Sequence, residues 1–99
     1  MYTVVLTVSL WKDSERKQHG MSFFRKLELP FAPFVELGIE TSQFTSRGIT
    51  QVVWRPEEQC FFCSVEDQTT SGSNEYDDLF KFLEEEERWI PANKWKKGS

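Results

Sequence analysis

One segment of the chain, residues 73–91, constrains the fold most, because it alone combines a helical period with two recognisable ends. Ser73 or Asn74 can accept a hydrogen bond from the free backbone N–H groups of a first helical turn, and the acidic residues that follow suit the positive end of the helix dipole. Pro91 cannot continue a helical hydrogen-bond ladder, so we expect the helix to end near Arg88 or Trp89.

Two apolar lines run along this predicted helix. At about 100° per residue, one stripe of apolar side chains lies on a single face and should cover a sheet. That stripe consists of Tyr76, Leu79, Phe80, Leu83 and Ile90. Phe82 and Trp89 lie on a second line that a core does not need, and they are candidate interface residues together with Glu85 and Glu86. Two interpretations of these carboxylates stay open, a solvated helix face and a surface for a basic partner.

Upstream of the helix, apolar residues alternate with polar ones, which is typical of half-buried strands. The predicted strands are residues 2–11, 21–29, 35–40, 49–55 and 60–66, the last two forming a hairpin around residues 56–59. The predicted loops are residues 12–20, 41–48 and 67–73. Pro30 and Pro33 remove two ladder donors, so their segment should form a corner, a bulge or an edge.

Strands in series without intervening helices imply an antiparallel sheet. The predicted fold class is therefore α+β: an antiparallel meander of about five strands, curled or barrel-like, with one C-terminal amphipathic helix packed on it. We expect residues 1–91 to form a single compact domain and residues 92–99 a basic C-terminal tail. The apolar content of 38% and the aromatic content of 15% exclude a chain that is disordered throughout.

The chain carries no apolar run long enough to span a bilayer. Residues 1–11 lack the basic start and the continuous apolar centre of a signal peptide, so we predict a cytoplasmic protein with no membrane span. The net charge is −4, and the sign is segregated: residues 56–87 hold many acidic side chains and one basic one, Lys81. Such an acidic segment argues against nucleic acid as a partner, because nucleic-acid affinity rests on neutralising phosphates.

Cys60 and Cys63 have the C-x-x-C spacing of redox pairs and of half zinc sites. On a strand, side chains three apart point to opposite faces, so the two sulfurs cannot meet each other or one metal ion. We therefore expect structural cysteines, and predict no metal and no cofactor. The single histidine, His19, has no nucleophile or orienting group at a recognisable spacing. We assign no catalytic residue, and no motif supports an enzyme.

Aromatic residues carry the functional hypotheses. The first is a small non-catalytic protein-interaction or regulatory module that binds a protein partner or a second copy of itself, as a homodimer would. Its candidate interface residues are Phe82, Trp89, Glu85, Glu86, Trp11 and Trp54. An exposed strand edge would contribute to the same role.

Two alternative functions use other residues. One is a small-ligand pocket, with or without catalysis, inside the curled sheet. Its candidate residues are Phe23, Phe34, Trp54 and Phe62, with Arg25 as the charge that orients an anionic group. The other is single-stranded nucleic acid stacked on Phe24 and Trp11 beside Arg25 and Lys26, which the acidic half of the chain disfavours.

Overall fold

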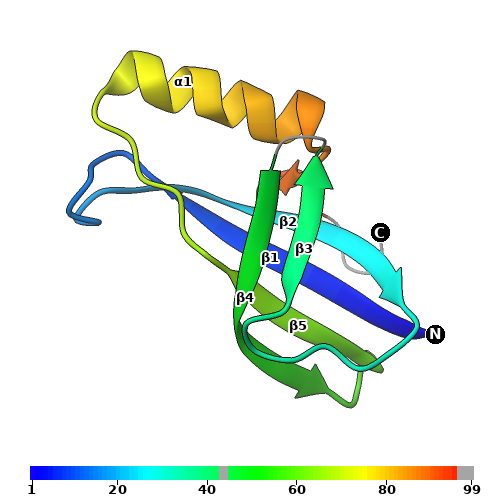
Figure 1. The fold of residues 1–99 in the computed structure, drawn as a ribbon. Helices are drawn as coiled ribbons and strands as arrows, with labels where there is room; N and C mark the ends of the chain where they lie inside the picture. Colours follow the sequence, from blue (N-terminus) through cyan, green and yellow to red (C-terminus); the bar gives the residue numbers. More distant parts are fainter. Residues whose placement is uncertain (43–44, 96–99) are drawn as a thin grey trace. The chain divides into compact units, whose positions relative to one another are not determined.

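The computed structural model describes residues 1–42 and 45–95 and shows an α+β fold, a mostly antiparallel six-stranded sheet with a C-terminal helix (Figure 1). In chain order the elements are β1 (Tyr2–Trp11), β2 (His19–Leu29), β3 (Gly38–Ser42), β4 (Thr45–Arg55), β5 (Cys60–Val65), α1 (Ser73–Lys81), the π-helix η1 (Phe82–Glu86) and β6 (Ile90–Pro91). Hydrogen bonds order the strands β3-β4-β5-β1-β2-β6. The predicted fold class is confirmed, with one strand more than expected.

Most of the predicted strands are confirmed, and the region around β3 is the exception. The β4–β5 hairpin turns at residues 56–59 as expected. The predicted third strand begins later, at Gly38, and the predicted loop over residues 41–48 is wrong, because β3 continues to Ser42 and β4 starts at Thr45. Residues 43–44 lie outside the described residues. Antiparallel pairing explains the difference: β3 pairs with β4 residue by residue, for example Ile39 with Arg47.

The chain folds as two compact units, whose boundaries cut through β1 and β2. Unit 1 comprises Met1–Thr7 and Arg25–Glu66, and unit 2 comprises Val8–Phe24 and the part of the chain from Asp67 onward. The prediction of a single domain over residues 1–91 stays a prediction. Of the predicted tail, residues 92–94 form a turn after β6, with Lys94 N–H donating to the Pro91 carbonyl, and residues 96–99 lie outside the described part.

The core of unit 1 forms where β1, β4 and β5 meet. β1 pairs with β5 in parallel, which the predicted meander did not include, and places Leu6 opposite Cys63. β4 pairs with β5 antiparallel on the other side. The buried side chains Val4, Leu6, Cys63 and Val65 lie on one face of these strands, so alternation along each strand supplies the core.

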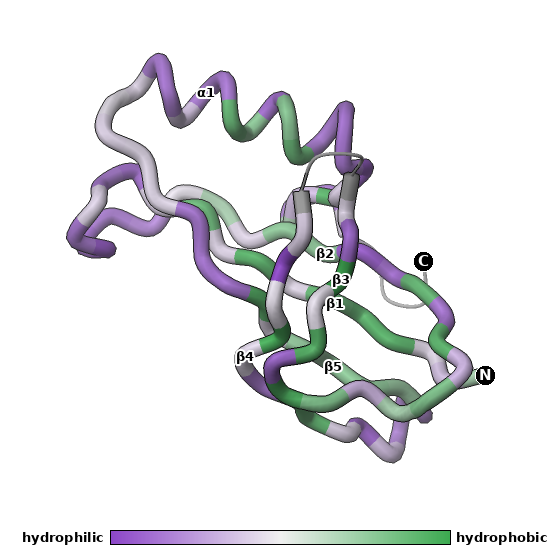
Figure 2. Tube along the Cα trace, viewed as in Figure 1, coloured by the Kyte–Doolittle hydropathy of each residue, from purple (hydrophilic) through white to green (hydrophobic). Residues whose placement is uncertain are grey.

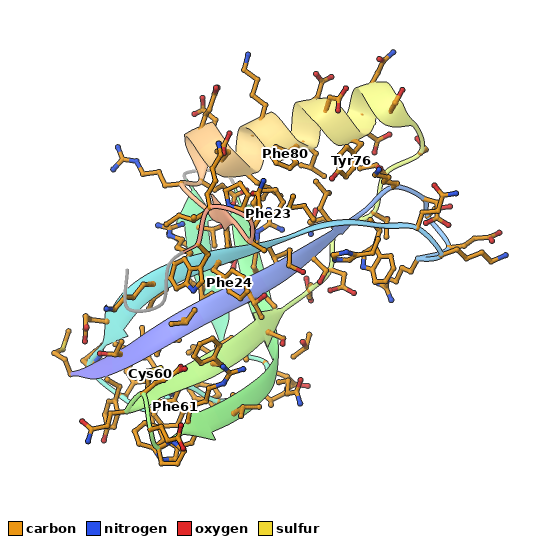
Figure 3. All side chains as sticks on the ribbon, turned by 180° about the vertical axis from the view of Figure 1, so that it is seen from behind. Phe23, Phe24, Cys60, Phe61, Tyr76 and Phe80 are labelled. Carbon is orange, nitrogen blue, oxygen red and sulfur yellow. The ribbon has the colours of Figure 1, made fainter. Side chains whose placement is uncertain are left out.

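Unit 2 is organised around the contact between α1 and the first half of β2. Phe80 of α1 meets Phe23 of β2 edge to face, with ring centroids 4.9 Å apart, and Tyr76 lies one turn earlier on the same side (Figure 3). Hydrophobic positions of α1 alternate with hydrophilic ones along the helix (Figure 2), as the predicted stripe requires. Gly20 lies directly beneath the Tyr76 ring, where a Cβ atom would overlap the ring carbons.

The start of the helix differs from the prediction, whereas its end lies close to the predicted Arg88. The helix starts at Ser73 after Gly72, and no side-chain hydrogen bond caps its first turn, so the predicted cap by Ser73 or Asn74 is wrong. At the C-terminal end the helix widens into η1, where Glu87 N–H donates to the Phe82 carbonyl at 3.2 Å. Arg88 then takes a left-handed backbone conformation (φ 59), which ends the helix.

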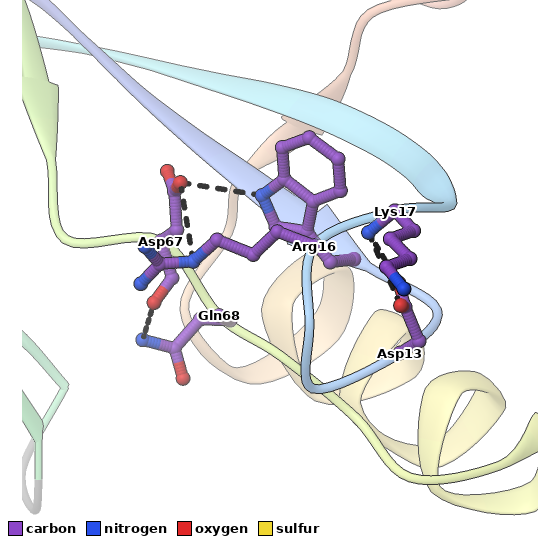
Figure 4. A network of polar contacts seen from close by, with 6 residues as sticks. Asp13, Arg16, Lys17, Asp67 and Gln68 are labelled. Atoms are coloured by element: carbon purple, nitrogen blue, oxygen red, sulfur yellow. Dashed lines mark hydrogen bonds and ion pairs between the residues drawn. The ribbon is translucent and has the colours of Figure 1, made fainter.

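The segment between β5 and α1 is held by β1 rather than acting as a loose linker. Gln68 N–H donates to the Ser9 carbonyl, and Trp11 N–H donates to the Gln68 carbonyl at 2.8 Å. The Thr70 hydroxyl adds a bond to the Trp11 carbonyl. Asp67 accepts a bond from the Trp11 indole N–H and lies 3.9 Å from Arg16 (Figure 4). These contacts fix the entry of the chain into α1.

Candidate functional site

Three aromatic side chains of unit 1 form a continuous surface, which we call the aromatic ladder: Tyr2 of β1, Phe61 of β5 and Trp54 of β4. The Trp54 and Phe61 ring centroids lie 4.9 Å apart, and those of Tyr2 and Phe61 lie 6.0 Å apart. Each ring therefore touches its neighbour across a strand boundary. Such cross-strand aromatic pairs stabilise one another and hold the rings in place.

Strand register explains why these three rings meet. Trp54 lies directly opposite Phe61 in the β4–β5 hairpin, and Phe61 lies beside Val4 in the parallel β1–β5 pair. Because side chains two apart on a strand share a face, Tyr2 lies on the same face as Val4. The ladder thus continues the core face of unit 1 toward its margin, where Trp54 is 50% and Tyr2 44% exposed.

The opposite face of the same hairpin carries a second stacked pair. The central carbon of the Arg55 guanidinium lies 3.7 Å from the centre of the Phe62 ring, which is a cation–π contact. Glu58 lies 3.9 Å from Arg55. Val53, next to the Phe62 backbone in register, is 41% exposed. Tryptophan, tyrosine and arginine are the residue types that dominate binding energy in protein interfaces.

A further exposed apolar group lies in the loop between β2 and β3. Phe31 and Phe34 are 45% and 54% exposed, their ring centroids lie 6.3 Å apart, and Val35 beside them is 52% exposed. Pro33 between them is buried and anchors the segment. The predicted corner at the two prolines is confirmed, since residues 30–37 belong to no strand.

The structure separates the predicted interface residues. Trp54 is exposed, as are Glu85 and Glu86 of η1, whereas Phe82 is half-buried. Trp89 is only 1% exposed, and its indole N–H donates to the Glu87 carboxylate at 3.1 Å. Its side chain therefore belongs to the core of unit 2 and presents no surface.

Trp11 is likewise engaged inside unit 2. It is half-buried, donates to Asp67 at 3.2 Å and meets the His19 ring edge to face, with centroids 5.1 Å apart. Phe24, proposed with Trp11 for base stacking, already stacks on Trp95 at 5.3 Å. Each of these rings has a partner within its own unit, so neither is an open stacking platform.

The predicted pocket residues have different surroundings, and Trp54 belongs to the aromatic ladder. Phe23 is fully buried against Phe80, and Phe34 is exposed in the loop. Phe62 lies under Arg55. Arg25, predicted to orient an anion, donates from Nη1 to the Thr41 carbonyl at 2.8 Å. Arg25 thus joins β2 to β3 within unit 1, which explains a cation on the apolar face of a strand.

The groups that most often carry catalysis or metals show structural roles. Cys60 and Cys63 are free thiols and are buried, as predicted, and burial raises the pKa of the Cys63 thiol to about 11. Burial, followed by the charge of Glu58, also raises the pKa of Cys60. In the described ranges, no three His, Cys, Asp or Glu side chains are placed to hold a metal ion. His19 Nε2 lies 3.2 Å from the Ser22 hydroxyl on an exposed strand end, a setting that does not exclude water from a reacting group.

Two members of the aromatic ladder, Tyr2 and Phe61, were not predicted as site residues. A signal for one of them existed in the sequence. The predicted hairpin around residues 56–59 places residue 54 opposite residue 61, so Trp54 and Phe61 are a cross-strand pair in that register. Tyr2 joins only through the parallel β1–β5 pairing, which has no local signal.

Comparison of the chain with protein-family models, with curated proteins and with solved structures gave no match. Over residues 1–42 and 45–95, no helix has both the length and the apolarity that a membrane span requires. The cytoplasmic location stays a prediction.

Proposed function

We propose that this chain is a non-catalytic protein-interaction module that binds a partner protein through the aromatic ladder. One observation carries the proposal: Trp54 is 50% exposed although it is held against Phe61. A large ring that is already ordered loses little conformational entropy on binding, so most of its buried area is available as binding energy. The partner would supply apolar side chains to the ring faces.

The acidic residues of η1 would affect how fast the partner associates. Glu85 and Glu86 are exposed, and exposed carboxylates act mainly on the rate of association with a basic partner. Under this proposal, a Glu85→Gln/Glu86→Gln variant associates more slowly at low salt and dissociates at an unchanged rate. Trp89 takes no part, because its side chain is buried.

A displayed library of random peptides tests the proposal, because it samples the side chains that any partner protein could offer. Peptides selected on the wild-type chain should lose binding to Trp54→Ala and keep it on Phe34→Ala, a matched variant that removes an equally exposed ring elsewhere in unit 1. Circular dichroism of both variants checks that the fold is intact. Peptides that bind Trp54→Ala as tightly as the wild type would overturn the proposal.

A further inference from the structure

The outer edge of β2 differs between its two halves. Among the strands formed by residues 1–42 and 45–95, β6 is the one paired with this edge, and its pairing covers Phe23 and Phe24, which lie opposite Pro91 and Ile90. Beyond them, in unit 1, β2 continues for five residues, Arg25–Leu29, with β1 and β6 as the neighbours of the strand in the sheet. Unpaired backbone groups along a sheet edge are a template for another strand.

Backbone direction identifies the groups that this edge presents. Ala92 N–H donates to the Ser22 carbonyl at 2.8 Å, so the backbone groups of Ser22 point toward the β6 side. In an antiparallel ladder, residues two apart point their backbone groups to the same side. Lys26 and Glu28 therefore present their N–H and C=O groups at the outer edge, while Leu27 between them points its groups toward β1.

A twofold rotation brings opposite charges of this segment together in two copies of the chain. If two copies of β2 pair antiparallel with Leu27 opposite Leu27, each Lys26 lies opposite Glu28 of the other copy. These Lys26 and Glu28 residues are the ones whose backbone groups point outward, so they form the hydrogen-bonded positions of the new ladder. Both side chains are exposed, and Glu28 accepts a bond from the Thr3 hydroxyl that holds one carboxylate oxygen in place.

We propose that the outer edge of β2 pairs with the same edge of a second copy of this chain, forming an isologous antiparallel dimer centred on Leu27. Two Lys26–Glu28 pairs flank two half-buried leucines at the axis. Pro30 has no N–H and β6 covers Phe24, so the new ladder is confined to the Lys26–Glu28 segment. The dimer is expected to be weak and salt-sensitive, because its charged pairs are at the surface.

Charges on a sheet edge also serve to prevent pairing, and a rival explanation is that Lys26 and Glu28 only protect the strand. The two explanations predict different effects when the sign of a charge at position 26 or 28 is reversed. A protecting charge works with either sign, whereas the twofold pairing needs opposite signs at positions 26 and 28. The other edge strand, β3, is a less open candidate, because Arg25 donates to its Thr41 carbonyl.

Charge reversal in the full chain decides between them, with sedimentation velocity over a concentration series as the measurement. Lys26→Glu or Glu28→Lys alone should weaken dimerisation at least about tenfold, since each places two like-charged pairs across the axis. The double variant Lys26→Glu/Glu28→Lys should dimerise as the wild type does. An equimolar mixture of the two single variants should form a heterodimer, because one chain then carries two acids and the other two lysines.

Two charge-matched variants serve as controls. Lys81→Glu on α1 and Glu40→Lys on β3 make the same charge changes at exposed positions outside the proposed ladder, and both should leave dimerisation unchanged. A wild-type chain that stays monomeric throughout the series would overturn the inference. So would single variants that dimerise normally, a mixture that fails to recover, or an effect of Glu40→Lys equal to that of Glu28→Lys. The aromatic ladder is untouched in all variants, so peptide binding tests the proposed function separately.

Discussion

The two units each hold an aromatic pair with the same ring spacing and opposite exposure. The centroids of Phe23 and Phe80 in unit 2 and of Trp54 and Phe61 in unit 1 are each 4.9 Å apart. Phe23 is fully buried because α1 covers it, whereas Trp54 is 50% exposed at the margin of its sheet face. Contact between rings is therefore no measure of their role. The pair that a helix covers belongs to the core, and the pair at the margin of its sheet face remains at the surface.

The largest effect should come from truncating the covered pair. Phe23→Ala removes a fully buried ring and leaves a cavity, so the free energy of unfolding should fall by about 3–5 kcal/mol. Urea unfolding followed by circular dichroism measures it. Phe34→Ala, the same chemical change at a 54% exposed ring, should cost under about 1 kcal/mol. Equal losses in the two variants would show that exposure does not separate these rings.

In unit 1, Arg25→Leu should lower the free energy of unfolding by about 1.5–3 kcal/mol, because it removes a charged donor from the Thr41 carbonyl. Arg25→Lys keeps a cationic donor and should recover part of the loss. Thermal unfolding gives the stability, and hydrogen exchange should show faster opening of β3. A neutral Arg25→Leu variant would mean that the contact between β2 and β3 does not stabilise unit 1.

In unit 2, Gly20→Val tests how closely α1 covers β2. The new side chain overlaps the Tyr76 ring, so the helix or the ring must move, at a cost of about 1–3 kcal/mol. In a Tyr76→Ala background the obstructing ring is gone, and the cost of Gly20→Val should shrink. A double-mutant cycle from urea unfolding measures this coupling. Additive costs would contradict the close packing.

Trp54→Ala should cost less stability than Phe23→Ala, Arg25→Leu or Gly20→Val. The ring is half exposed, and its loss removes mainly the contact with Phe61, worth about 0.5–1.5 kcal/mol. Peptide binding should nevertheless be abolished. A loss of stability as large as that of Phe23→Ala would place Trp54 in the core and remove the contrast between the two pairs.

The last prediction concerns the stability of unit 1 at alkaline pH and its buried thiol, Cys63. Burial raises the pKa of Cys63 from 9.0 to about 11, so the folded state keeps a proton that the unfolded chain releases. The free energy of unfolding should therefore fall as the pH rises from about 9 toward 11, by at most about 1.4 kcal/mol per pH unit. Cys63→Ala should flatten this slope. An identical slope in the variant would mean that other groups cause the loss.

Much of the fold could be predicted because it follows from local periodicity. The faces of β1 and β2, the β4–β5 hairpin and the apolar stripe of the helix all depend on spacings of two or of three to four residues. Trp54 was predicted as a site residue because it is an aromatic residue near the predicted hairpin loop. Phe61 could have been found, since the hairpin register places it opposite Trp54.

Trp89 shows where that reasoning fails. Its assignment to a second line with Phe82 assumed an unbroken α-helix. The helix instead widens at Phe82 into η1, and Arg88 turns the backbone at φ 59. The position of Trp89 therefore no longer follows the helical spacing. Its backbone N–H donates to the Leu83 carbonyl at 2.9 Å. A helical-wheel projection assumes one constant angle per residue, so it does not predict a change of hydrogen-bond pattern within the helix.

The sequence by itself determined which residues alternate, which face of each strand is apolar and where one amphipathic helix lies, since these depend on neighbours along the chain. Only the tertiary structure decided that β1 pairs in parallel with β5 and that β3 extends through a segment predicted as a loop. It also decided that Trp89 is buried while Trp54 is exposed. The physical reason is that strand partners and covering elements are set by contacts between residues far apart in sequence, whose energies override local preference.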